Sequence, residues 1–174
     1  MPFGKITPLF AERISPHVKG RKVHDLGSGD DLSLSLALVE LGAKEVVAID
    51  TYPYIQIATS PVRYVRNYFE SVVDEDVEVA FVSWPSNRSS SGLLELIRPA
   101  SIVIYLGKCT DGSMCGSPEL YRYFSKRAVI AHEPHHTNTL VIYGGESSQG
   151  RDLLPEELAG IDHERVYSFE ARRA

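Results

Sequence analysis

The sequence predicts an α/β fold: a doubly wound, mostly parallel sheet of seven strands with helices on both faces and an antiparallel hairpin at its C-terminal end. Three observations support this prediction. Short runs rich in valine and isoleucine alternate with helix-like stretches, which is typical of parallel strands joined by crossover helices. A Gly-x-Gly turn follows the first run. The last two runs, residues 127–132 and 139–143, leave no room for a helix between them, so they must pair antiparallel.

Capping and turn residues mark the ends of two predicted helices. A helix over 32–38 follows Asp30 and Asp31, either of which can cap it, and Gly42 can lie just past its end. Ser117 as a cap and Pro118 at the first helical position begin a later helix. The other expected strands cover residues 22–26, 45–50, 62–68, 77–82 and 101–106. The other expected helices cover residues 9–18 (interrupted near Pro16), 54–60, 92–98 and 155–159.

Length and composition fit one ordinary domain. The chain has 174 residues, of which 43% are hydrophobic and 24% charged. We expect a single domain over residues 1–174, with a core at about 22–145 and a surface tail at 151–174. Neither a membrane-length apolar run of roughly 20 residues nor a signal-peptide pattern occurs, which predicts a cytoplasmic protein without membrane association. A net charge of −5 does not favour a nucleic-acid partner.

The residues most informative about function are the turn Asp25-Leu26-Gly27-Ser28-Gly29 and the acid at the end of the next strand. Glycine lets the chain turn tightly and lets a ligand approach bare backbone. The turn would also aim free amide groups of the following helix at the space above the sheet, where open α/β sheets bind ligands. Asp50 ends the second strand about twenty residues on, where a carboxylate can accept hydrogen bonds from both hydroxyls of a ribose.

Charge around the turn indicates which nucleoside binds. A dinucleotide fingerprint needs a third glycine where this chain has Leu32, and Asp30 and Asp31 would repel a pyrophosphate. S-adenosylmethionine has no phosphate and carries a sulfonium and an ammonium group, so nearby acids suit it. The predicted cofactor is therefore S-adenosylmethionine and not NAD.

Residues 23–29, Val-His-Asp-Leu-Gly-Ser-Gly, and residues 46–50, Val-Val-Ala-Ile-Asp, resemble motifs I and II of the class I S-adenosylmethionine-dependent methyltransferases. The order of strands resembles this family over about residues 22–145. The resemblance implies seven cofactor-binding residues: Asp25, Gly27, Ser28 and Gly29 along the methionine part, Asp50 at the ribose, and Tyr52 and Asn67 at the adenine.

The sequence departs from the family pattern in two places. Asp31 replaces a third glycine found in many members. The fourth-strand motif of amino-methylating members is Asp/Asn/Ser-Pro-Pro-aromatic, whereas this chain has Ser83-Trp84-Pro85-Ser86, with Trp84 at the first proline position. The loop after this strand is where the fold presents the methyl acceptor, so Ser83, Trp84 and Asn87 are candidate catalytic residues.

Histidines near the predicted hairpin turn offer a further candidate. His132, His135 and His136 lie close together, and one of them, His132 in our assignment, can act as a general base near neutral pH. Together with Cys109 and Cys115 they could bind zinc, but their spacing matches no familiar zinc motif, so we predict no metal site. The glycine-rich loop 107–117 either recognises substrate, closes as a mobile lid, or is a surface loop.

These features predict a methyltransferase that acts on a small molecule or a peptide side chain, with nitrogen favoured over oxygen because of the Ser83-Trp84-Pro85 segment. The alternative is a non-catalytic S-adenosylmethionine-binding or scaffold subunit that supports a partner enzyme. A nucleotide-dependent oxidoreductase is disfavoured by the missing third glycine and by the closing hairpin. Because the chain has few insertions, acceptor recognition requires its loops, its N-terminal helix, a protein partner or a second copy of the chain.

Overall fold

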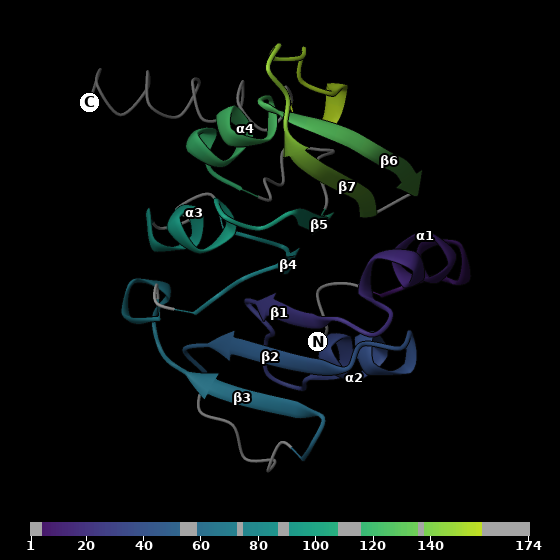
Figure 1. The fold of residues 1–174 in the computed structure, drawn as a ribbon, viewed down its shortest axis with the longest axis vertical. Helices are drawn as coiled ribbons and strands as arrows, with labels where there is room; N and C mark the ends of the chain where they lie inside the picture. The colour runs from purple at the N-terminus through teal and green to yellow at the C-terminus, as the bar shows by residue number, and fades with distance from the viewer. Residues whose placement is uncertain are drawn as a thin grey trace, which may run out of the picture.

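A seven-stranded sheet organises the fold (Figure 1). In the computed structural model the strand order is β3-β2-β1-β4-β5-β7-β6. The strands are β1 (Lys22–Leu26), β2 (Glu45–Asp50), β3 (Val62–Arg66), β4 (Val79–Ser83), β5 (Ile102–Gly107), β6 (Arg127–His135) and β7 (Asn138–Glu146). The pairs among β1 to β5 are parallel, and β7 runs antiparallel to both β5 and β6. The predicted sheet and its antiparallel hairpin are confirmed.

The structure describes residues 5–52, 59–72, 75–86, 91–107, 116–135 and 138–157. Most of the helix expected at 54–60 and most of the loop expected at 107–117 fall outside these residues, and the described residues 59 and 60 are not helical. Within them, no helix is long and apolar enough to cross a membrane.

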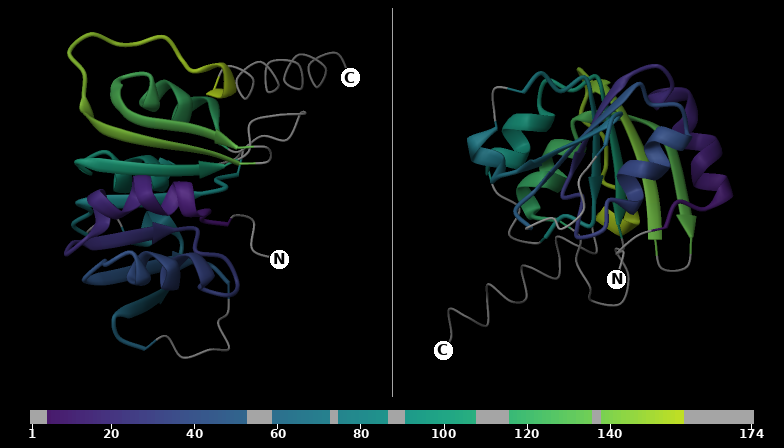
Figure 2. Two further views of the ribbon diagram at one scale, coloured as in Figure 1. Left: turned by 90° about the vertical axis from the view of Figure 1, so that its right-hand side faces the viewer. Right: turned by 90° about the horizontal axis from the view of Figure 1, so that it is seen from below.

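Helices cover both faces of the sheet, as predicted (Figures 1 and 2). Helices α1 (Pro8–Val18) and α2 (Ser33–Glu40) pack on one face. The other face carries α3 (Ser91–Ile97), α4 (Pro118–Phe124) and the short 3-10 helix η1 (Phe69–Ser71). A hydrophobic core lies on each side of the sheet, because strand residues buried on both faces alternate between the two layers.

Two helix predictions are refined by the structure. Helix α1 continues through Pro16 to Val18, whereas an interruption was expected. The Pro16 nitrogen carries no hydrogen, so the helix loses the one hydrogen bond to the carbonyl oxygen of Glu12; both residues are exposed, and water can bind that oxygen instead. Helix α4 begins as predicted: the Ser117 hydroxyl accepts a hydrogen bond from the Leu120 amide, and Pro118 occupies the first turn.

The position of β1 determines where a ligand can bind. β1 pairs with β2 on one side and with β4 on the other. The chain therefore extends the sheet from β1 in one direction through β2 and β3, and then in the opposite direction through β4 and β5. In open α/β sheets such a reversal opens a crevice at the carboxyl ends of the strands. The Gly27–Gly29 turn after β1 and Ser83 at the end of β4 lie beside this crevice.

The segment after β7 is fastened to the second layer by a buried acid. Glu157 is 3% exposed and accepts hydrogen bonds from the Tyr143 hydroxyl, from both terminal nitrogens of Arg151 and from the Leu154 amide. Arg151 also donates to the carbonyl oxygens of Arg127 and Phe124. This network ties residues 151–157 to α4 and to the β6–β7 hairpin.

Replacing Glu157 with alanine should lower the free energy of unfolding by about 2–3 kcal/mol, because it leaves the mostly buried Arg151 without its carboxylate. Glu119→Ala is the matched control: Glu119 and its partner Arg122 are exposed, and such pairs contribute less than about 1 kcal/mol. Urea unfolding followed by circular dichroism measures both. Equal effects of the two variants would contradict a stabilising role for the buried network.

Candidate functional site

The turn after β1 adopts a conformation that requires glycine. Gly27 has a φ of +85° and Gly29 a φ of +78°, values that side-chain-bearing residues rarely adopt. The Gly27 amide donates to the carbonyl oxygen of Ile49 at 2.9 Å, and the Gly29 amide donates to Oδ2 of Asp50 at 2.9 Å. The turn is therefore fastened to the end of β2.

Asp50 holds two segments at once. Its Oδ2 binds Gly29, and its Oδ1 accepts a hydrogen bond from the Tyr52 amide at 3.1 Å. The Tyr64 hydroxyl lies 2.5 Å from the carbonyl oxygen of Tyr52 and 3.1 Å from that of Asp50, which steadies the chain after β2. A carboxylate has about four acceptor positions, so Asp50 can still accept hydrogen bonds from a ligand.

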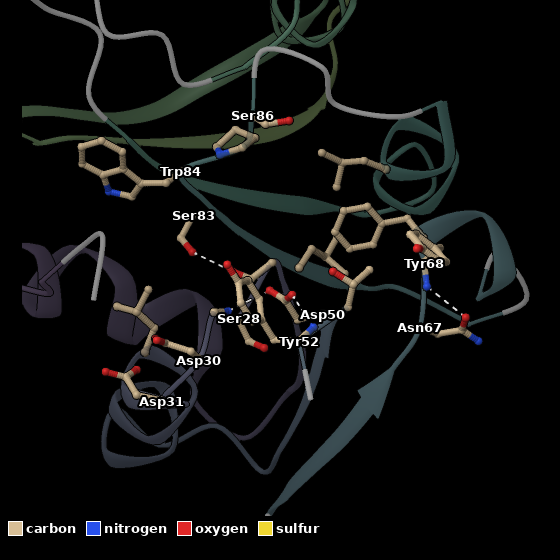
Figure 3. A pocket seen from close by; sticks show the side chains of 18 of the residues that line it. Ser28, Asp30, Asp31, Asp50, Tyr52, Asn67, Tyr68, Ser83, Trp84 and Ser86 are labelled. Atoms are coloured by element: carbon tan, nitrogen blue, oxygen red, sulfur yellow. Dashed lines mark hydrogen bonds between the residues drawn. The ribbon is translucent and has the colours of Figure 1, made fainter. Parts of the chain in front are cut away.

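A cavity of about 510 Å³ opens above this junction (Figure 3). Its volume lies within the range of small-molecule sites, roughly 300–1,000 Å³. The structure brings eight of the sequence-predicted site residues to its wall: Gly27, Ser28, Gly29, Asp50, Tyr52, Asn67, Ser83 and Trp84. Residues from the ends of β1, β2, β3 and β4 therefore meet at one site.

The lining of the cavity is acidic. The described residues that line it include four carboxylates, Asp30, Asp31, Asp50 and Glu70, and no lysine, arginine or histidine. Like charges repel, so this wall disfavours phosphate groups and favours a cationic ligand.

Ser28 presents a hydroxyl that requires a partner. Its side chain is 4% exposed and lines the cavity, and its Oγ has no hydrogen-bond partner among the described residues. A buried polar atom without a partner costs roughly 1–3 kcal/mol. A ligand with a polar group at this position removes that cost.

Asp25 does not line the cavity, which corrects its assignment as a direct contact. Side chains alternate along β1, so Asp25 points toward α2, where the Ser35 hydroxyl donates to its Oδ2 at 2.5 Å. Asp25 is fully buried, and its Oδ1 has no partner within the described part of the chain. Burial raises the pKa of Asp25 to about 7; the negative charge of Asp50 adds to the rise, and the Ser35 hydrogen bond opposes it.

The amide groups at the start of α2 are less available to a ligand than the sequence predicts. The Ser33 amide donates to Oδ1 of Asp31 at 2.9 Å, so this aspartate occupies one of them. Leu32 precedes the helix with a φ of +53°, and its side chain is buried. The turn therefore offers a ligand its bare backbone surface and the Ser28 hydroxyl more than free helix amides.

Trp84 has a backbone conformation that proline cannot adopt. Its φ is +46°, whereas the proline ring fixes φ near −65°, and its N–H donates to the carbonyl oxygen of Leu106 at 2.8 Å. A proline at position 84, as in the Pro-Pro motif, is therefore incompatible with the backbone conformation found here. The Ser83 hydroxyl donates to the carbonyl oxygen of Gly27 at 3.4 Å, which links the end of β4 to the glycine turn.

Asn67 lies at the opposite end of the cavity from Asp30 and Asp31 (Figure 3). The backbone amide of Asn67 donates to the Asp50 carbonyl oxygen at 3.0 Å, and its side-chain Oδ1 accepts a hydrogen bond from the backbone amide of Tyr68 at 2.9 Å. The side-chain nitrogen Nδ2 is therefore the group of Asn67 that can donate to a ligand.

The remaining candidates are not among the described residues that line the cavity. His132 is on the edge strand β6, outside the cavity lining, and its Nε2 is 3.4 Å from Oε2 of Glu156. We therefore do not retain His132 in the site. Asn87, Cys109, Cys115 and His136 fall outside the described residues.

Sequence reasoning missed several wall residues. Tyr68, Phe69 and Glu70 line the cavity directly after Asn67, and Leu93 lines it from α3. The first three follow the carboxyl end of β3, so their place in the chain was a usable signal. Leu93 lies in a helix, and nothing in its local sequence marks it as a ligand contact.

Comparisons with known proteins agree with this geometry. No protein-family model matches the chain, and no curated protein matches its sequence. Solved structures do match. A ribosomal protein L11 methylase from Lactobacillus delbrueckii subsp. bulgaricus has a TM-score of 0.55 at 16% identity over 83% of this chain and 81% of that chain.

Two further structures have the same fold. The 1,6-didemethyltoxoflavin-N1-methyltransferase of Burkholderia thailandensis, solved with S-adenosylhomocysteine, has a TM-score of 0.56 at 14% identity, covering 79% of this chain and 76% of that one. A Pyrococcus horikoshii protein provisionally named an RNA methyltransferase has a TM-score of 0.53 at 13% identity, covering 80% and 81%. The chain therefore has the fold of the class I methyltransferases, as its motifs indicated.

Asp25→Asn should change how stability depends on pH. The pKa of Asp25 is 3.8 without perturbation and about 7 in the fold, so the folded state binds the extra proton between these values. The stability that this carboxyl contributes is fully present below pH 3.8 and is lost as pH rises to about 7. The free energy of unfolding of the variant, minus that of the wild type, should therefore rise by about 2–4 kcal/mol between pH 4 and pH 7.5.

The difference between the two proteins is the quantity to measure, by urea unfolding at each pH. Burial lowers the pKa of His24, so His24 contributes stability that increases as pH rises toward 6.5. This opposite contribution is common to both proteins and cancels in the difference. A difference that does not change with pH would show that Asp25 is ionised throughout.

Trp84→Pro should lower the free energy of unfolding by about 3 kcal/mol more than Trp84→Ala. Both variants lose the indole ring, but only proline also loses the hydrogen bond to Leu106 and is incompatible with the positive φ. Chemical denaturation followed by circular dichroism gives both values. Equal stability of the two variants would contradict the left-handed conformation at this residue.

Proposed function

We propose that this chain is an S-adenosylmethionine-dependent methyltransferase whose methyl donor occupies the cavity beside β1, β2 and β4. The observation that carries the proposal is the Asp50 carboxylate, held at the cavity wall by the amides of Gly29 and Tyr52. It is suited to accept hydrogen bonds from the hydroxyls of a ribose.

The other groups of the cavity suit the rest of the donor. The cationic sulfonium and ammonium groups fit a wall with four carboxylates. The Ser28 hydroxyl gains a hydrogen-bond partner in the amino-acid part of the donor, which lies along the glycine turn. Tyr52, after β2, and Asn67, after β3, line the cavity beside Asp50 and suit contacts with the base.

When bound, S-adenosylmethionine supplies an electrophilic methyl group on a positively charged sulfur. The protein then has to position an acceptor beside the donor, exclude water and accommodate charge. Ser83 and Trp84 lie at the wall nearest the glycine turn and suit this role. The face of Trp84 can stabilise a cation by cation–π attraction, and Asn87, in the same loop, remains a proposed polar contact.

We infer that the acceptor atom is nitrogen, on a small molecule or a peptide side chain. The described part of the lining contains no histidine that could act as a base near neutral pH. An uncharged amine already has the lone pair that it needs, whereas a hydroxyl must lose a proton. Methylation moves positive charge to the nitrogen, and the acidic wall favours that product. The same wall disfavours a phosphate-rich acceptor such as RNA.

One observation supports a second candidate, a donor-binding subunit without turnover. The backbone at Trp84 excludes the Pro-Pro segment expected of amino-methylating members of the fold class. Such a subunit would bind the donor as the enzyme does and would transfer methyl groups only with a partner protein. Turnover by the purified chain with a panel of amines separates the two candidates.

Calorimetric titration with S-adenosylmethionine, S-adenosylhomocysteine and NAD tests the proposal. Both adenosyl compounds should bind and NAD should not. Trp84 is the only tryptophan of the sequence and lines the cavity, so its fluorescence should change on binding. Absence of binding by both adenosyl compounds would refute the cofactor assignment.

Asp50→Ala should weaken binding of S-adenosylhomocysteine about 10- to 100-fold, since hydrogen bonds to a charged group contribute about 1.5–3 kcal/mol. Glu45→Ala is the matched control: Glu45 is a carboxylate at the other end of β2, outside the cavity lining, and its loss should change affinity less than twofold. Unchanged affinity in Asp50→Ala would remove Asp50 from the donor site.

A further inference from the structure

Gly92, in the first turn of α3, lies against the backbone of another element. A Cβ atom at this position would lie 2.5 Å from the amide nitrogen of Glu70, 2.9 Å from Cα of Glu70 and 2.9 Å from the carbonyl carbon of Phe69. These atoms belong to the backbone of η1, so no side-chain rotation can relieve the overlap. Gly92 does not have a positive φ. Glycine is needed here for space and not for backbone conformation.

This close approach brings two parts of the cavity wall together. Phe69 and Glu70 line the cavity from η1, and Leu93, the residue after Gly92, lines it from α3. Leu93 is 2% exposed, and Phe69 packs against the same core cluster. The distance between η1 and α3 therefore sets the position of the Phe69 and Leu93 side chains in the wall.

The strand order shows which end of the cavity this wall forms. β3 lies beside β2 on the side away from β1. A nucleoside whose ribose is at Asp50 and whose tail follows the glycine turn after β1 must direct its base toward β3. In Figure 3, Asp50 lies between Ser28 on one side and the Asn67–Tyr68 segment on the other. The wall of Phe69 and Leu93 is on the Asn67 side, at the base end.

We infer that Gly92 is a positioning residue for the base of the bound nucleoside: its missing side chain allows η1 to pack directly on α3, which brings Phe69 and Leu93 together as the base-end wall. The inference rests on the proposed function, since it requires a nucleoside in the cavity. A side chain at position 92 displaces η1 and leaves the glycine turn unchanged.

The probes that separate the two ends of the cavity are adenosine and S-adenosylhomocysteine. Adenosine has the base and the ribose but lacks the amino-acid tail. Gly92→Ala should weaken both ligands by the same factor, at least fivefold, in calorimetric titrations. Ser28→Ala should weaken S-adenosylhomocysteine and leave adenosine within twofold, because Ser28 faces the tail.

A matched control separates positioning from general destabilisation. Leu96 lies in the same helix, is 1% exposed and does not line the cavity. Leu96→Ala should lower Tm by opening a cavity in the core and should change adenosine affinity less than twofold. Gly145→Ala controls for the substitution itself, since a Cβ at Gly145 has no atom within 4 Å.

The outcomes are distinct. If wild-type protein binds adenosine and Gly92→Ala binds it equally well, this inference is overturned and the proposed function stands. Binding of neither ligand by the wild type overturns both. If Gly92→Ala does not fold, Phe69→Ala decides instead: an adenosine affinity reduced at least fivefold supports the wall, and an unchanged affinity overturns it.

Discussion

The hydrogen bond from the Gly29 amide to the Asp50 carboxylate is the contact on which the rest of the site depends. It joins the turn after β1 to the end of β2, and the second oxygen of Asp50 directs the chain after β2 through the Tyr52 amide. Because Gly27 and Gly29 have positive φ values, the turn leaves its backbone bare beside the cavity. One carboxylate therefore organises the turn and also faces the ligand space.

Electrostatics distinguish the two sides of this junction. On the cavity side, four carboxylates line the wall near solvent, where water screens them and a cationic ligand can approach. Behind the turn, Asp25 is fully buried beside Ser35, and burial raises its pKa to about 7. With this pKa the carboxyl is about half protonated at pH 7 and mostly neutral at lower pH, which reduces the cost of burying its charge. The acids before and after the glycine turn thus have different roles. Asp25 packs the turn against α2, whereas Asp30 and Asp31 contribute negative charge to the cavity wall.

The fold is shared with proteins whose names describe quite different acceptors, among them a ribosomal protein and 1,6-didemethyltoxoflavin. A common fold therefore does not identify an acceptor; the side chains at the site must. In this chain the end of β4 presents Trp84 in a left-handed conformation, which costs about 1–3 kcal/mol and persists because the hydrogen bond to Leu106 holds it. Our proposal of a nitrogen acceptor rests instead on the acidic lining of the cavity, in which the described residues include no histidine.

The sequence by itself determined the sheet, the hairpin and the place of the cavity. Alternating apolar runs, the Gly-x-Gly turn and an acid at the end of the next strand are local patterns. Strands and turns can be predicted from them because these conformations depend mainly on residues that are close in the sequence. Only the tertiary structure decided which side chains reach the cavity. Asp25 and Asp50 each lie at or near a strand end, yet the alternation of β1 turns Asp25 away. His132 shares a chain neighbourhood with other polar residues but lies on the edge strand β6. The close approach of Gly92 to Glu70 of η1 joins residues 22 positions apart, and no local pattern encodes a distance between backbones that meet only after packing.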